Sequence, residues 1–115
     1  MIHLRTLLDT DGDNTAQACK TTAGDLMYVH VINVNSVDTW LQLFDAAAAD
    51  VTVGTTTPKL SFLIPAGNGT DAAGFTENFG NFPVHFETAI TYACTTTATG
   101  SGDPTTGLTV NLMYR

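Results

Sequence analysis

Charged side chains are scarce in this sequence, and basic ones are the scarcest. Asp, Glu, Lys and Arg together make up 13% of the 115 residues, against a usual share of about 25%. Four basic residues stand against eleven acidic ones, which leaves a net charge of -7. Contacts with phosphates or anionic lipids need clustered Lys and Arg, and these four residues are scattered. We therefore expect neither nucleic acid nor a membrane surface as a partner.

Long apolar runs and cysteine are also scarce. No stretch approaches the about 18 successive apolar residues of a membrane-spanning helix, and the first nine residues lack the apolar run of a signal peptide. We expect a protein that is made in the cytoplasm of its host. In such a compartment Cys19 and Cys94 are expected to be buried, reduced thiols and not a disulfide.

No segment has the pattern of a long helix. Four alanines at 46–49 are too few to form a stable helix, although alanine is the best helix former. Four phenylalanines have helical spacing, at Phe75, Phe79, Phe82 and Phe86. Because Gly80 and Pro83 interrupt this stripe, we expect a strand over 75–79, then a bend, with the rings closing one end of the core.

Strand patterns fill most of the chain instead. Residues 26–34 and 39–45 are rich in apolar β-branched and aromatic side chains. The turn residues between them predict that the second strand folds antiparallel onto the first, and we expect 26–34 to be covered on both faces. Further strands are expected at 4–8, 16–22 (an edge), 59–64, 75–79, 87–95 and 108–114, with 46–59 as an extended crossing between two sheets.

These strands and turns predict one all-β domain over residues 1–115. In 108–114, apolar residues alternate with Thr109, Asn111 and Met113, as in a sheet that is covered on one face. The expected architecture is an antiparallel two-sheet sandwich of about eight strands, with jelly-roll or Greek-key connections.

Motifs that carry chemistry are weak in this sequence. Asp9, Asp11 and Asp13 have the spacing of the first ligands of a calcium loop, but Asn14 replaces the glycine and Lys20 the bidentate glutamate, so a solvated turn is expected. The histidines (His3, His30 and His85) lack the spacing of zinc ligands, and no Gly-x-Ser-x-Gly motif frames a nucleophile. We assign no catalytic, cofactor-binding or metal-binding residue and expect no cofactor and no enzymatic activity.

The aromatic residues allow two interpretations. Trp40 with Phe44, and Tyr28 with Tyr92, could form a sugar-stacking platform, but aromatic residues on strands more often belong to a core. The residues expected to act as interface or core anchors are Trp40, Phe44, Phe79, Phe82 and Tyr114.

Three successive segments carry a resemblance to a known group of proteins. Trp40-Leu-Gln-Leu-Phe-Asp45, the Val53-Gly-Thr-Thr-Thr-Pro58 segment, and Leu60 to Ile64 followed by Pro-Ala-Gly67 occur in this order. With the opening Asp-Gly-Asp-Asn-Thr and the closing strand, the chain resembles small virion structural proteins of tailed bacteriophages.

The resemblance implies a jelly-roll capsid decoration (cement) protein on the outer surface of the virion. Such a protein binds the major capsid protein as a homo-oligomer, usually a trimer, and stabilises the shell. The alternative is a carbohydrate- or receptor-binding module of a tail fibre, or another head, neck or tail accessory.

Overall fold

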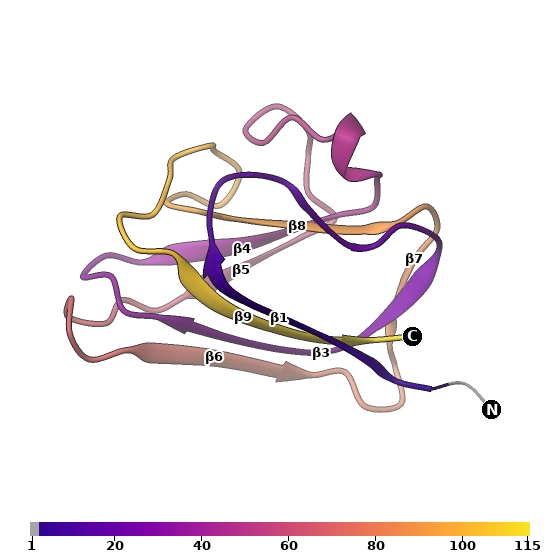
Figure 1. The fold of residues 1–115 in the computed structure, drawn as a ribbon, viewed down its shortest axis with the longest axis horizontal. Helices are drawn as coiled ribbons and strands as arrows, with labels where there is room; N and C mark the ends of the chain where they lie inside the picture. Colours follow the sequence, from indigo (N-terminus) through magenta and orange to yellow (C-terminus); the bar gives the residue numbers. More distant parts are fainter. Residues whose placement is uncertain (1–2) are drawn as a thin grey trace.

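The computed structural model describes residues 3–115, which form nine strands and one short 3₁₀ helix (Figure 1). The helix is η1 (Ala48–Asp50). The strands are β1 (Arg5–Gly12), β2 (Gln17–Lys20), β3 (Gly24–Asn33), β4 (Thr39–Phe44), β5 (Leu60–Ile64), β6 (Ala73–Asn78), β7 (Val84–Phe86), β8 (Ile90–Thr95) and β9 (Leu108–Tyr114).

The strands form two antiparallel sheets that pack face to face. One sheet has the order β1-β9-β3-β6, with β7 paired to β3 beyond the end of β6, and the other has the order β2-β8-β4-β5. When β6 and β7 are counted as one interrupted strand, eight strands divide into two four-stranded sheets as in a jelly roll, and every connection except that from β4 to β5 crosses between the sheets. The expected all-β, two-sheet architecture is confirmed.

The core lies between the sheets and follows from the alternation of apolar side chains. In β9, Leu108, Val110 and Leu112 are fully buried, as the sequence predicts, while Thr109, Asn111 and Met113 turn to the outer side. At one end, Phe62 stacks on Phe75 with ring centroids 5.2 Å apart, and Phe79 lies 6.4 Å from Phe62. The expected strand at the phenylalanine stripe is present, and three of its rings, those of Phe75, Phe79 and Phe86, pack in or against the core.

The expected hairpin between 26–34 and 39–45 is wrong. β3 and β4 belong to different sheets, so the turn between them carries the chain across the sandwich. Side chains hold this crossing: Asn33 donates from Nδ2 to the carbonyl oxygens of Val37 (3.0 Å) and Pro65 (3.1 Å), and Asn35 donates to that of Thr106 (2.8 Å). Long-range hydrogen bonds therefore select a crossing where local turn chemistry suggested a hairpin.

The expected crossing at 46–59 is also wrong, because it joins two strands of one sheet. β4 pairs with β5 in the four-stranded sheet, and the intervening loop with η1 lies over the outer side of that sheet (Figure 1).

The strand expected at 87–95 begins only at Ile90. The Asp45 carboxylate accepts hydrogen bonds from the backbone N–H groups of Glu87 (2.9 Å), Thr88 (2.8 Å) and Ala89 (3.4 Å). These groups turn toward a side chain and not toward a neighbouring strand, which separates β7 from β8.

Candidate interaction surface

The outer face of the four-stranded sheet is covered by the chain's own loops. Gln42 points outward from β4, yet it is fully buried, because its Nε2 donates to the carbonyl oxygens of Thr97 (3.4 Å) and Gly100 (3.0 Å) in the loop 96–107. Ser61 Oγ donates to the carbonyl of Ala98 at 2.7 Å. Thr91 Oγ1 donates to the carbonyl of Ala46 at 2.6 Å. All six residues of β8 are buried as a result.

The two covering loops also contact each other. Gly54 has a φ of 92°, and a Cβ placed there would lie 2.9 Å from the Cβ of Ser101. Ser101 in turn accepts a hydrogen bond from Nδ2 of Asn14 through its carbonyl oxygen, at 2.9 Å. Loops 46–59 and 96–107 thus cover this face around Gln42, Ser61 and Thr91, whereas the paired Trp40 on β4 and Leu63 on β5 stay partly accessible.

The outer face of the five-stranded sheet is open. The prediction that 26–34 is covered on both faces is wrong, since Tyr28, His30 and Ile32 are only half-buried on this side. Two rows of side chains cross the face from β1 through β9 and β3 to β6. The rows are Thr6, Met113, Tyr28 and Asn78, and Leu8, Asn111, His30 and Thr76. Neither row contains Asp, Glu, Lys or Arg, although the chain carries a net charge of -7. We call these two rows the open face.

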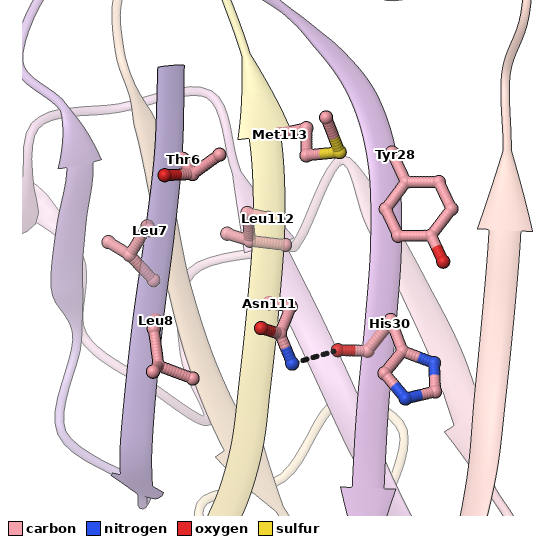
Figure 2. Close-up of a pocket in the computed structure, with 8 residues that line it drawn as sticks. All are labelled: Thr6, Leu7, Leu8, Tyr28, His30, Asn111, Leu112 and Met113. Carbon is pink, nitrogen blue, oxygen red and sulfur yellow. Dashed lines mark hydrogen bonds between the residues drawn. The ribbon is translucent and has the colours of Figure 1, made fainter. Parts of the chain in front are cut away.

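The open face holds a hollow of about 430 Å³ (Figure 2). Thr6 and Leu8 on β1 lie at one side of it, Tyr28 and His30 on β3 at the other, and Asn111 and Met113 on β9 lie between them. His30 Nδ1 and Thr76 Oγ1 are 2.7 Å apart, and Asn111 Nδ2 donates to the carbonyl of His30 at 3.4 Å. The hollow offers apolar contact area with a few hydrogen-bonding groups, which is the composition of a docking surface.

The five anchors expected from the sequence do not gather at this hollow. Phe44 is 1% exposed. Trp40 is half-buried on the outer side of β4, and Tyr114 and Phe79 pack partly against the core. Phe82 is 85% exposed, so its expected place in the core is wrong. The reason is the turn 79–82, in which Gly80 has a φ of 56° and the N–H of Phe82 donates to the carbonyl of Phe79.

The two aromatic pairs suggested as a sugar platform are not formed. Phe44 is buried, so of this pair only the Trp40 ring is partly accessible. Tyr28 lies on the open face, whereas Tyr92 points into the core from β8 and donates to Asp9 Oδ2 at 2.7 Å. Burial and then this hydrogen bond raise the pKa of Tyr92.

Of the residues that the sequence left unassigned, Leu8, Asn111 and Met113 belong to the open face. The signal was present for two of them, because the alternation in 108–114 placed Asn111 and Met113 outward. Leu8 had no such signal, since the short apolar segment 4–8 was expected without a face.

Two of the aspartates near the start of the chain, Asp9 and Asp13, accept hydrogen bonds from nearby backbone N–H groups. Asp9 Oδ1 accepts from the N–H of Asp11, and Asp13 Oδ1 from the N–H of Thr15, both at 2.9 Å. Within residues 3–115, no three His, Cys, Asp or Glu side chains are grouped so that they could share a metal ion.

A polar cluster ties the last residue to β3. Asp25 lies 2.7 Å from Nδ1 of His85 and accepts from Nε of Arg115 at 3.2 Å. The hydrogen bond from His85 lowers the pKa of Asp25 most; burial opposes this, and Arg115 adds to the lowering. His3, His30 and His85 do not converge on one site: His3 lies at the start of the described chain, His30 on the open face and His85 on β7.

The two thiols are free, and burial raises the pKa of each to about 12. For Cys94, the charges of Asp9 and Asp13 add to the effect of burial. Because the thiolate is the reactive form, we expect the native protein to react with a disulfide reagent at neutral pH at least about a hundredfold more slowly than the protein in urea. Absorbance of the released thiol measures both rates. Fast labelling of native Cys19 would contradict its burial.

In the comparisons with known proteins, no protein-family model, no curated protein and no solved structure matches the chain. Among residues 3–115, no helix has the length and apolar character needed to cross a bilayer.

Proposed function

We propose that the protein is a structural subunit of a tailed-phage virion that decorates the outer surface of the capsid and stabilises the shell. In this role it binds the major capsid protein as a homo-oligomer, with the trimer as the favoured form. The proposal starts from the resemblance of segments 40–45, 53–58 and 60–67 to small virion proteins, and it is supported by the two-sheet sandwich that such proteins share.

The observation that supports this role best is the one-sided surface of the sandwich. One sheet is covered over much of its outer side by loops that hydrogen-bond to its outward side chains, including Gln42 and Ser61. The other sheet presents the open face, which carries apolar contact area and no carboxylate. In a chain of net charge -7, an uncharged face is the surface on which another protein can dock with the least desolvation of charge.

A modest contact area is enough for this task. Copies that are linked in an oligomer engage neighbouring lattice sites together, so their avidity exceeds the affinity of each contact. The net charge of -7 favours a basic shell surface, within a Debye length of about 8 Å.

A charge placed on the open face tests the proposal. We expect Met113→Glu to lower the affinity for expanded capsids by at least about tenfold, because the interface would bury an unpaired carboxylate. Co-sedimentation of purified protein with expanded capsids of the encoding phage measures the affinity. Val37→Glu is the matched control, since Val37 is 56% exposed in the turn between β3 and β4.

Two results would count against the proposal. Wild-type protein that does not sediment with expanded capsids would remove decoration as the function. If Met113→Glu and Val37→Glu both bound like the wild type, the open face would not be the docking surface.

A further inference from the structure

The free edge of β1 is the feature that leads beyond the proposed function. β1 is the outermost strand of the five-stranded sheet, and β9 is the only strand that pairs with it among residues 3–115. No other backbone hydrogen bond reaches Arg5 to Asp9 from the described part of the chain. A groove of about 510 Å³ lies between this edge and β2, and its lining includes Leu7 and Leu8, the carboxylates of Asp9, Asp11 and Asp13, and Gln17 and Ala18 of β2. Exposed edges of this kind are templates for pairing with another strand.

The charged residues of β1 are placed so that two copies of the strand can complement each other. Arg5 and Asp9 lie four residues apart with Leu7 midway between them, and all three share one face of the strand. If two β1 strands pair antiparallel about a two-fold axis at Leu7, Arg5 of each copy lies opposite Asp9 of the other. Such opposite-charge pairs stabilise a sheet, whereas directly opposed like charges destabilise it. Centring the axis on Asp9 would oppose two carboxylates, so the charges favour the axis at Leu7.

The other face of β1 points to the same register. Leu8 is 65% exposed and Leu4 is 51% exposed, and both lie on the outer side with Thr6. With the axis at Leu7, Leu8 lies opposite Thr6 of the second copy and diagonal to its Leu4 and Leu8. Diagonal neighbours of this size are within contact range. Four exposed leucines then form one continuous apolar row.

The remaining edges do not have this complementarity. β6 carries Glu77 and no basic residue, and β2 has only four residues with a register shift in its pairing. β5 has five residues and is followed directly by Pro65, which has no N–H to donate.

We propose that β1 pairs with β1 of a second copy, antiparallel about a two-fold axis at Leu7, so that the five-stranded sheet continues from one molecule into the next. The occupant of this edge is thus another copy of the chain. The inference does not depend on capsid binding, because the pairing needs no shell, but a two-fold contact closes as a dimer and so differs from the trimer favoured above.

Cysteine cross-linking tests the register with residues outside the core. Thr6→Cys and Leu8→Cys variants are mixed under mild oxidation, and disulfide-linked dimer is measured by non-reducing electrophoresis. The proposed register places these two positions directly opposite, so we expect the mixture to cross-link at least about tenfold faster than either variant alone, in which the thiols are diagonal. Wild-type protein is the blank, since Cys19 and Cys94 are partly or fully buried.

Removing the charge pair tests the contact itself. We expect Arg5→Gln to raise the dimer Kd by about tenfold, because two opposed charge pairs are lost at once. Lys59→Gln, which has the same net charge, should leave the Kd unchanged. Sedimentation velocity measures both.

Three outcomes would overturn the proposal: wild-type protein that is monomeric at high micromolar concentration, equal cross-linking in the mixture and in the single variants, or a trimer in which positions 6 and 8 do not cross-link. Wild-type dimers that Arg5→Gln weakens and Lys59→Gln does not would support it, whether or not the protein binds capsids.

Discussion

Asn33→Asp is expected to destabilise the protein by about 3–5 kcal/mol at neutral pH, the largest effect of any single substitution proposed here. Asn33 is fully buried, and its Nδ2 faces the carbonyl oxygens of Val37, Ile64 and Pro65 at 3.0 to 3.4 Å. An aspartate would place a carboxylate oxygen against these acceptors without a proton to share. Urea unfolding followed by circular dichroism measures the loss.

The sign of the pH dependence identifies the cause. Burial among acceptors raises the pKa of a carboxyl group in the folded state above its unfolded value of about 3.9. Below that pH both states are protonated and the loss of stability is smallest; as the pH rises, the unfolded state ionises first and the loss grows. Asn33→Ala lacks the charge, so its smaller loss should not vary with pH in this way.

Asn81→Asp is the matched control, because Asn81 is exposed in the turn 79–82. It should change the free energy of unfolding by less than about 0.5 kcal/mol. If Asn33→Asp were as stable as Asn33→Ala at neutral pH, the inferred role of the Asn33 amide as a donor to three carbonyls would be wrong.

Asp45→Ala is expected to cost about 2–3 kcal/mol. The Asp45 carboxylate accepts from the N–H groups of Glu87, Thr88 and Ala89; water can replace it at the first two, which are exposed, whereas the N–H of buried Ala89 would lose its acceptor. Thermal unfolding of the variant and of Asp50→Ala, whose carboxylate is exposed on η1, separates this role from the loss of a negative charge.

The stabilising role of Asp45 should also appear in the dependence of stability on acidic pH. Burial alone would raise the pKa of Asp45, but the three N–H donors and the charge of Lys59 outweigh it and lower the pKa. A lowered folded pKa contributes stability above the unfolded pKa of about 3.9, and this contribution is lost as the pH falls through the folded value. We expect Asp45→Asn to unfold with a shallower dependence on pH below about pH 4 than the wild type. An unchanged slope would show that the carboxylate does not carry this contribution.

The sequence predicted most of the strands, but it missed β7, began the next strand at 87 instead of Ile90, and did not show how the strands are assigned to sheets. The alternation in 108–114 follows from the single buried face of β9, so it could be read directly. The separation of β3 from β4 could not, because it depends on hydrogen bonds from Asn33 and Asn35 to Pro65 and Thr106, residues about 30 and 70 positions away. Local turn residues show that the chain bends, but not which sheet the next strand joins.

Local residue patterns likewise do not predict which sheet face is covered and which is open. In β8 the outward positions are Thr91, Ala93 and Thr95, and their small size fits the loops that lie over them. Gln42 is buried because its amide binds carbonyl groups of the loop 96–107. The residue pattern of β4 alone does not predict this contact. The open face could be predicted only in part, because the sequence does not show which of the two sheets the loops cover.

The loops over the four-stranded sheet limit how copies of this protein can associate. A sandwich with two exposed sheet faces can bind a neighbour on each face, which allows open-ended stacking. Here loops 46–59 and 96–107 close one of those directions, while Gln42 and Ser61 fasten the second loop in place. If the protein docks through the open face as proposed, its copies should form a single layer, with the loop-covered side turned to the solvent.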